Sequence, residues 1–97
     1  MTTRFEWDPG KAAGDLRKHG VSFDTALRVF ADPFALTEQD RIEEGERRWQ
    51  TLGLVEGWLL LLVAHTLLDE NGGEVIRIIS ARRAEPRERR RYAQQTR

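Results

Sequence analysis

The sequence predicts an α+β domain in which an N-terminal αα-hairpin packs on an antiparallel β-meander followed by a C-terminal helix. Two observations support this prediction. Helical patterns are confined to the two ends of the chain, and the middle consists of apolar or alternating segments separated by short turns. Helices segregated from a run of antiparallel strands are typical of the α+β class. With 97 residues, the chain suits a single domain over residues 1–97.

The N-terminal elements follow from their cap and turn residues. Residues 5–7 alternate in polarity and predict a short edge strand. Asp8-Pro9 is typical of a helix start, and Gly20 is typical of its left-handed end. Ser22 then caps a second helix. The apolar side chains of that helix fall on one face, at Phe23, Ala26, Leu27 and Phe30. A tight turn between two helices makes the αα-hairpin.

Four strands are expected in the middle of the chain. Residues 34–37 and 48–54 are candidates for the first two, and the acidic segment 38–45 between them is interpreted as a loop. Residues 58–66 are apolar at nearly every position, which predicts a central strand covered on both faces. The Asn71-Gly72 turn then leads into the last strand, residues 74–82, as a β-hairpin.

The last predicted helix, residues 84–95, is rich in arginine and lacks a clear apolar stripe. Residues 82–97 contain seven arginines against two glutamates, whereas residues 32–46 contain six acidic residues against one arginine. A cationic end indicates either a phosphate-bearing or acidic partner, or only a solvated helix face. The helix is therefore either weakly docked or ordered by a partner.

Composition narrows the classes of function. The formal net charge is zero and there is no cysteine, so net charge identifies no partner, and disulfides, thiolate chemistry and zinc ribbons are excluded. No apolar stretch has the length of a membrane span, and the N-terminus lacks the apolar region of a signal peptide. We expect a cytoplasmic protein with no membrane contact.

Three titratable side chains are candidates for chemistry. His65 ends the most apolar strand, so it is either a core histidine bonded to the backbone or a general acid or base. Lys18 and His19 close the first helix. There they either complement the negative end of the helix or line the rim of an active site.

Arginines inside the predicted sheet point to anion chemistry. Arg77 lies between two isoleucines, so its guanidinium must reach water, a carboxylate or a ligand phosphate. In a purely structural role its expected partner is Glu46. Arg48 opens an earlier strand and is a similar case. Two such arginines could clamp a phosphate and stabilise charge that develops in a transition state.

The length of the hairpin loop decides which candidates share a face of the sheet. A two-residue loop places His65 with Ser80 and Arg82, and Arg77 with Thr66. An odd-numbered loop would instead place His65 beside Arg77. Both registers stay open at the level of the sequence.

No metal-ligand spacing, glycine-rich phosphate loop or nucleophile elbow is found, so we expect neither a metal nor a cofactor. Lysine, histidine, glutamate and arginine without a cofactor suit RNA cleavage by the neighbouring 2′-hydroxyl. One group would take the 2′ proton, cations would stabilise the phosphorane, and another group would protonate the leaving oxygen. Trp49, Trp58 and Tyr92 either stack on an unpaired base or pack in the core.

Five short motifs, in order and covering nearly the whole chain, resemble the BrnT toxins of bacterial type II toxin–antitoxin systems. They are Phe-Glu-Trp-Asp at 5–8, Lys-His-Gly-Val-Ser-Phe at 18–23, Val-Phe-Ala-Asp-Pro at 29–33, Gly-Glu at 45–46 with Arg-Trp at 48–49, and Arg-Ile-Ile-Ser-Ala-Arg at 77–82. The resemblance implies a RelE-like fold and a metal-independent ribonuclease that inhibits translation and growth. It also implies a DNA-binding BrnA-type antitoxin that neutralises the toxin and carries the complex to operator DNA.

The resemblance also implies site residues. The positions that match its recurrent polar residues are Lys18, His19, Glu46, Arg48, His65, Arg77 and Arg82. We predict that the catalytic residues are His65 and Arg77, supported by Glu46, Arg48 and Lys18. RNA contacts are predicted for His19, Arg82, Arg83, Arg87, Arg90 and Tyr92. The chain departs from the family pattern in the apolar Leu67-Leu68 before the hairpin, in Arg47 before the matching arginine, and in its arginine-rich last helix.

A second interpretation of the sequence is a protein that binds but does not catalyse. The chain could be a non-catalytic nucleic-acid-binding or partner-binding subunit of a regulatory complex, with the basic last helix making the contacts. RNA that is bound but not cleaved, with affinity that falls on removal of arginines in that helix, would favour this interpretation.

Overall fold

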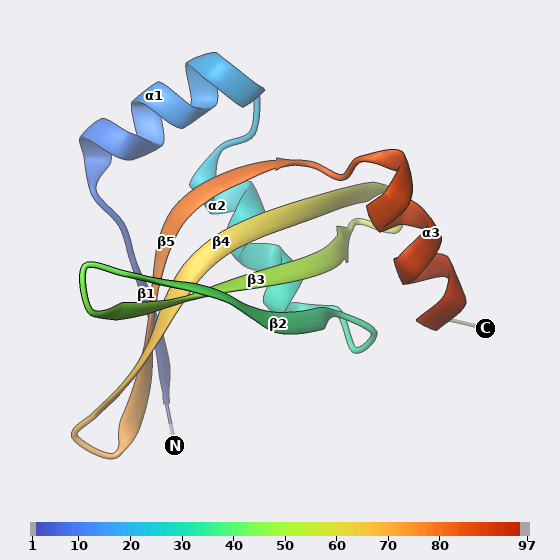
Figure 1. Cartoon of the computed structure of the whole chain (residues 1–97). Helices are drawn as coiled ribbons and strands as arrows, with labels where there is room; N and C mark the ends of the chain where they lie inside the picture. Colours follow the sequence, from blue (N-terminus) through green and yellow to red (C-terminus); the bar gives the residue numbers. More distant parts are fainter. Residues whose placement is uncertain (1, 96–97) are drawn as a thin grey trace.

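The structure, a computed structural model, describes residues 2–95. It has one five-stranded sheet with helices on both sides of it (Figure 1). In chain order the elements are β1 (Thr3–Glu6), α1 (Pro9–His19), α2 (Phe23–Ala26), the 3-10 helix η1 (Leu27–Ala31), β2 (Leu36–Glu43), β3 (Glu46–Val55), β4 (Leu59–Glu70), β5 (Gly73–Arg83) and α3 (Pro86–Gln95). The predicted α+β class and the C-terminal helix are confirmed.

The sheet has the order β1-β5-β4-β3-β2 and is mixed. Strands β2 to β5 form the predicted antiparallel meander. The short edge strand β1 pairs in parallel with β5, with Thr3 opposite Glu74 and Glu6 opposite Arg77. A purely antiparallel sheet is therefore wrong at this edge, where the first strand of the chain lies beside the last.

The acidic segment that the sequence indicated as a loop belongs to a hairpin. Strand β2 continues to Glu43 and β3 already begins at Glu46, so the turn consists of Glu44 and Gly45 with φ angles of 52° and 78°. Positive φ at both turn residues is the geometry of a tight hairpin turn. Polar composition was misleading here because β2 is an edge strand exposed along most of its length.

The N-terminal helices match the predicted αα-hairpin only in part. α1 begins where the Asp8 side chain accepts a hydrogen bond from the Lys11 N–H, and it ends at Gly20 with φ 73°. The second helix is a single α turn capped by Ser22, and it continues as the 3-10 helix η1. Gly53 lets η1 approach closely, since a Cβ at Gly53 would lie 2.7 Å from Cβ of Val29.

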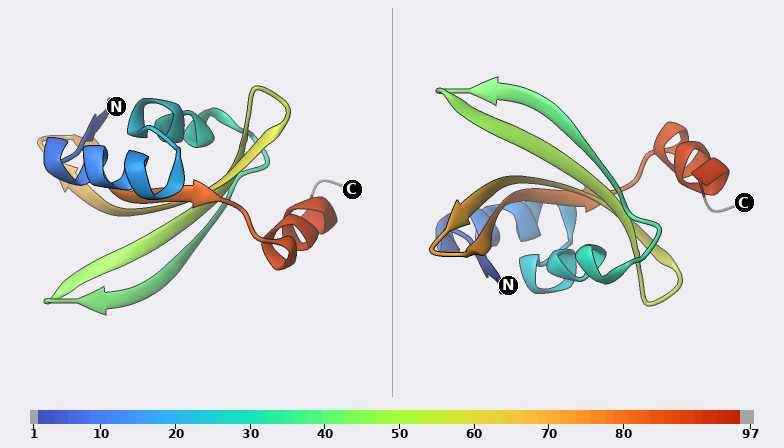
Figure 2. Two further views of the ribbon diagram at one scale, coloured as in Figure 1. Left: turned by 90° about the horizontal axis from the view of Figure 1, so that it is seen from above. Right: turned by 90° about the horizontal axis from the view of Figure 1, so that it is seen from below.

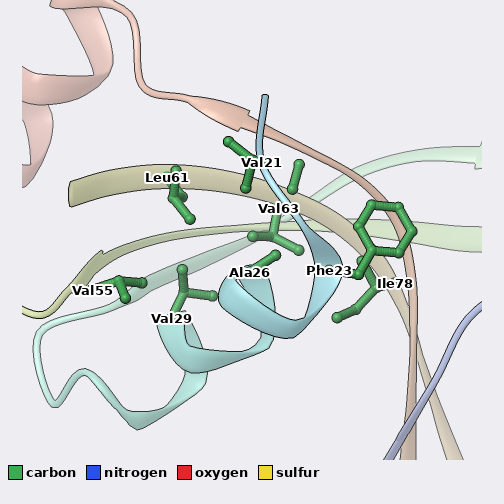
Figure 3. Packing of buried hydrophobic residues seen from close by; sticks show 9 residues of the cluster. Val21, Phe23, Ala26, Val29, Val55, Leu61, Val63 and Ile78 are labelled. Carbon is green, nitrogen blue, oxygen red and sulfur yellow. The ribbon is translucent and has the colours of Figure 1, made fainter. Parts of the chain in front are cut away.

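The helices α1, α2 and η1 cover one face of the sheet, as the views along the sheet show (Figure 2). Between these helices and the sheet lies the main core, in which side chains of α2 and η1 meet those of the central strands (Figure 3). Its buried members are Val21, Phe23, Ala26, Val29, Val55, Leu61, Val63, Ile78 and Ala81. We call the opposite face of the sheet the open face.

α3 covers one end of the open face. Leu52, Leu60 and Leu62 pack there against Ala84 and Tyr92. The Tyr92 hydroxyl donates a hydrogen bond of 2.6 Å to Asp32, and the Leu54 N–H donates one of 2.8 Å to the same carboxylate oxygen. The helix is thus docked within the chain itself, which resolves one alternative left by the sequence.

Candidate functional site

A bulge in β5 determines which candidates share a face. The turn has two residues, Asn71 and Gly72, and Thr66 lies opposite Arg77 as predicted. At Ile79 the register then shifts, so that Ser80 lies opposite Ala64 and Arg82 opposite Leu62. The predicted sharing of a face by His65, Ser80 and Arg82 is therefore wrong, because the extra residue moves Ser80 and Arg82 to the open face with Arg77.

Three of the predicted catalytic side chains meet on the open face. Nη2 of Arg77 lies 2.5 Å from Oε1 of Glu46, which is the partner expected for Arg77 in a purely structural role. Nε of Arg48 lies 3.8 Å from that same oxygen. Two guanidinium groups on β3 and β5 thus converge on one carboxylate oxygen. We call Glu46, Arg48 and Arg77 the arginine cluster.

The two arginines differ in their contact with solvent. The side chain of Arg77 is 39% exposed, whereas that of Arg48 is 19% exposed. A second carboxylate, Glu43, lies 3.9 Å from Nη1 of Arg48. Arg48 is consequently held between two acids at the end of the β2–β3 hairpin, and Arg77 is the more accessible cation.

His65 lies on the opposite face, in the core. It is fully buried, with the Phe30 ring centroid 4.9 Å from its own. Its Nδ1 lies 3.2 Å from the Thr66 carbonyl oxygen, and its Nε2 lies 2.7 Å from the Thr51 hydroxyl. Because a carbonyl oxygen only accepts, Nδ1 carries the proton and Nε2 accepts from Thr51. Thr51 in turn contacts Thr37 at 2.8 Å.

Burial lowers the pKa of His65 below its ordinary value, and the hydrogen bond to the Thr66 carbonyl opposes that shift without cancelling it. The imidazole is therefore neutral at pH 7. The structure does not bring His65 together with Arg77, and this geometry favours the core histidine over the general acid or base.

Lys18 and His19 end α1, which belongs to the helix-covered side. Ala12 of this helix packs on the main core, and its Asp15 accepts a hydrogen bond of 3.0 Å from the Ala81 N–H of β5. Lys18 is exposed and His19 is half-buried. The structure does not bring these two side chains to the arginine cluster.

The predicted RNA-binding side chains fall into three groups. Arg82 makes two hydrogen bonds of 2.9 Å to Glu88, and this contact raises the pKa of Arg82 and lowers that of Glu88. Tyr92 is buried by α3 and bound to Asp32, so its ring is not available for stacking. The remaining arginines, Arg83, Arg87 and Arg90, are exposed. Trp58 is 65% exposed at the β3–β4 turn, and Trp49 is half-buried.

The Tyr92–Asp32 pair was missed by sequence reasoning. Burial by itself would raise the pKa of Asp32, but hydrogen bonds from Tyr92 and from the N–H groups of Leu54 and Phe34 hold it below its ordinary value. Burial, followed by the hydrogen bond to Asp32 and its charge, raises the pKa of Tyr92 to about 12. Asp-Pro was interpreted only as the end of a helix, and nothing local marks a partner 60 residues away.

The arginine cluster is partly exposed at the surface of the sheet. A hollow of about 460 Å³ lies elsewhere, between η1, the β3–β4 turn and Tyr92, and does not include the cluster. Within residues 2–95 no group of three or more histidine and acidic side chains is placed to hold a metal ion. No helix of the described chain is long and apolar enough to cross a membrane.

The chain is a small α+β protein whose open sheet face carries two arginines and a glutamate in contact. A family model described as the ribonuclease toxin BrnT of type II toxin–antitoxin systems matches residues 7–88. The chain therefore belongs to the BrnT family of ribonuclease toxins, and membership of a type II system implies an antitoxin partner.

A solved structure supports the same fold. The crystal structure of the Brucella abortus ribonuclease toxin BrnT superposes with a TM-score of 0.68 and 21% sequence identity. The match covers 88% of this chain and 99% of the Brucella chain. At that identity the likeness shows the fold. No curated protein sequence matches the chain.

Proposed function

We propose that this BrnT-family toxin cleaves RNA without a metal ion, using the arginine cluster on the open face. The observation that carries the proposal is the convergence of Arg77 and Arg48 on one oxygen of Glu46, at 2.5 Å and 3.8 Å. Two guanidinium groups at one point supply the positive charge that a phosphoryl-transfer transition state requires. On this proposal, the carboxylate between them takes the proton.

In the proposed reaction the ribose 2′-oxygen attacks the adjacent phosphorus and loses its proton to Glu46. The bond between phosphorus and the 5′-oxygen breaks, and the departing oxygen takes a proton from solvent, to which the open face gives access. Arg48 and Arg77 bind the non-bridging oxygens and stabilise the charge of the pentacovalent intermediate. The products are a 2′,3′-cyclic phosphate and a 5′-hydroxyl.

The other predicted residues take different roles in this proposal. Arg82, on the same face as Arg77, and the exposed Arg83, Arg87 and Arg90 would contact the RNA backbone. Lys18 and His19, which the structure leaves away from the cluster, would act on RNA that extends past the edge of the sheet. For His65 we propose a structural role, in which its buried ring stabilises strand β4, the strand that also carries Thr66.

The proposal also includes the antitoxin partner and the cellular effect that the resemblance to BrnT toxins implies. A BrnA-type antitoxin would neutralise the toxin and bind operator DNA on behalf of the complex, and RNA cleavage would inhibit translation and growth in the cytoplasm. A RelE-like relationship is expected from the sequence resemblance. Co-purification with an antitoxin encoded beside the toxin would test the partner.

The catalytic proposal is tested with purified protein and RNA in the presence of EDTA. We expect cleavage by the wild type, with 5′-hydroxyl and 2′,3′-cyclic phosphate ends. Arg77→Ala and Arg48→Ala should each lower kcat by about 10²-fold to 10³-fold, the range for removing one donor to a developing oxyanion. Glu46→Gln should also lower kcat, because an amide does not accept the 2′ proton.

A matched control is Arg28→Ala. Arg28 also forms an ion pair, 2.7 Å from Glu56, but it lies outside the arginine cluster. Its cleavage rate should stay within about twofold of the wild type, because Arg28 does not belong to the cluster. The variant should also stay folded, since an exposed ion pair contributes at most about 1 kcal/mol to stability. Full activity of Arg77→Ala, or activity only with added Mg²⁺, would contradict the proposal.

A further inference from the structure

Two buried hydrogen-bond donors in and beside the arginine cluster lack a partner within residues 2–95. They are Nε of Arg48 and the hydroxyl of Thr66, and each atom is almost fully screened from solvent. Thr66 as a whole is 1% exposed. Buried polar groups are nearly always hydrogen-bonded, so two such groups in one place require an explanation.

The sheet register places both groups at the same point of the open face. Thr66 of β4 lies directly opposite Arg77 of β5. On the other side of β4, Trp49 lies opposite His65, so Arg48 is the next residue along β3 towards Thr66. Thr66 therefore lies on the central strand between the two arginines.

The oxygen on which the two arginines converge is a carboxylate oxygen of the protein, Oε1 of Glu46, and not one of a ligand. Oε1 of Glu46 forms a short ion pair with Arg77 but is 3.8 Å from Nε of Arg48, beyond hydrogen-bond distance. One carboxylate satisfies one arginine and leaves the second arginine and the threonine hydroxyl incompletely paired. A tetrahedral phosphate group has more oxygens, and these point in more directions than those of a planar carboxylate.

The geometry points to a phosphate subsite formed by Arg48, Thr66 and Arg77, in which the Glu46 carboxylate takes the place of the ligand in the free protein. This inference rests on the proposed function, and it adds Thr66 as a binding residue and Glu46 as an internal competitor. An RNA phosphodiester that enters displaces the carboxylate from Arg77. It then accepts hydrogen bonds from Nε of Arg48 and from the Thr66 hydroxyl.

Displacement has a consequence for the reaction. The Glu46 carboxylate that leaves Arg77 remains beside the bound phosphodiester, where it is no longer neutralised by an ion pair. The same movement that opens the subsite therefore also frees the carboxylate that is proposed to take the 2′ proton.

The probe for this subsite is a single-stranded RNA that is fully 2′-O-methylated, so that binding is measured without cleavage. Fluorescence anisotropy should show that Glu46→Gln binds it about threefold to fivefold more tightly than the wild type, because the competing ion pair is removed. Arg48→Gln and Arg77→Gln should bind it about tenfold more weakly. Inorganic phosphate should compete with the probe, and it should compete better in Glu46→Gln.

Glu43→Gln is the matched control for charge. It removes one carboxylate from the same hairpin and one ion pair of 3.9 Å with Arg48, but it does not touch Arg77. Removal of negative charge in general would tighten binding equally in both variants. A gain confined to Glu46→Gln supports the subsite, and an equal gain or a loss in that variant overturns it.

Thr66→Val separates a ligand role from a structural role. Valine has the same shape, and the hydroxyl has no partner among the described residues, so the melting temperature should be unchanged or higher. Binding of the methylated RNA should nevertheless weaken about tenfold, the expected loss for a hydrogen bond to a charged group. A lowered melting temperature with unchanged binding would overturn the assignment.

Binding and cleavage give separate outcomes. If ordinary RNA is cut but Glu46→Gln and Thr66→Val bind as the wild type does, the subsite is wrong and the proposed ribonuclease activity stands. If the methylated RNA binds as expected but ordinary RNA is not cut, the subsite stands and the proposed cleavage fails. The wild type and these variants therefore test both statements.

Discussion

The histidine in this chain shows how a titratable side chain can look functional and still belong to the core. His65 follows an apolar strand, and the sequence does not reveal which face it occupies. Its ring lies in the core, where Thr51 satisfies Nε2 and the Thr66 carbonyl satisfies Nδ1. A neutral imidazole with both nitrogens bonded is a stable core group.

This burial predicts an effect of pH on stability. The folded pKa of His65 is lowered, so the unfolded chain binds a proton more readily than the folded chain does. The contribution of His65 is complete above the unfolded pKa of about 6.5 and is lost as pH falls below it, by at most about 1.4 kcal/mol per pH unit. Urea unfolding at pH 7.5 and pH 5.5 should show the loss.

His65→Gln serves as the comparison, because glutamine keeps polar atoms near Thr51 but does not titrate. The difference in unfolding free energy between the two pH values should shrink in this variant. His19, which is half-buried, is present in both proteins, so the comparison isolates the change at position 65. An equal pH dependence in the two proteins would show that His65 is not responsible.

At the scale of single residues, the sequence offered Glu46 as a structural partner for Arg77, but it did not show that Arg48 and Thr66 lie beside that pair. An arginine between isoleucines needs an acceptor, and this requirement restricts the choice of partners. Thr66, in contrast, is an ordinary strand residue in the sequence. Its importance depends on the two arginines that flank it in space, which no local pattern records.

Among the elements, α3 differs most from its expected behaviour. Its sequence lacks an apolar stripe, yet one tyrosine anchors it. Tyr92 packs against Leu52, Leu60 and Leu62, and its hydroxyl reaches Asp32 at the end of η1. A single aromatic side chain can replace a stripe because it combines a large apolar surface with one polar contact.

Tyr92→Phe should therefore destabilise the protein without emptying the apolar cluster. The ring stays, but Asp32 loses one of its three donors, and a hydrogen bond to a charged group contributes about 1.5 to 3 kcal/mol. The measurement is the free energy of unfolding in guanidinium chloride at pH 7.

Arg91→Ala provides the reference for that measurement. Arg91 also links α3 to the sheet through an ion pair with Glu38, but both side chains are largely exposed. Its removal should lower the free energy of unfolding by at most about 1 kcal/mol. If Arg91→Ala proves the more damaging change, α3 is held by charge and not by Tyr92.

The ends of the strands and their register were predicted less well from the sequence than the existence of the strands. Apolar runs located β5 to within one residue at each end, but β4 continues to Glu70, four residues past its predicted end. The exposed strand β2 gave no periodic signal because little of it is buried. The bulge at Ile79 has no turn residue to announce it, yet it determines that Arg82 and Arg77 share a face.

Taken as a whole, the molecule separates its two kinds of chemistry by face. The helix-covered face is apolar and includes His65, whereas the open face carries the arginine cluster and is shielded at one end by α3. The α+β class could be predicted from the order of patterns along the chain. Glu46, Arg48 and Arg77 could be named as candidates from the sequence, but their convergence at one point could not, because it depends on the register of three strands.

This separation predicts different effects for arginines of α3 and of the sheet. The double change Arg87→Ala and Arg90→Ala should weaken RNA binding and reduce its dependence on salt, by about 0.7 in log–log slope for each RNA phosphate that the protein no longer neutralises. At saturating RNA, kcat should stay near the wild-type value, unlike in Arg77→Ala. A large loss of kcat in the double variant would place the catalytic surface on α3.

The parallel pairing of β1 with β5 also determines when the sheet can finish folding as the chain is synthesised. Strand β1 leaves the ribosome well before its neighbour and can pair only after residue 74 has been made, since Thr3 lies opposite Glu74. Arg77 belongs to that same late strand, and its contact with Glu46 on β3 crosses the intervening strand β4. A ribosome-bound fragment that stops before β5 therefore has an unfinished sheet and lacks one of its two key cations. On the proposed mechanism, such a fragment lacks the pair of arginines that RNA cleavage requires.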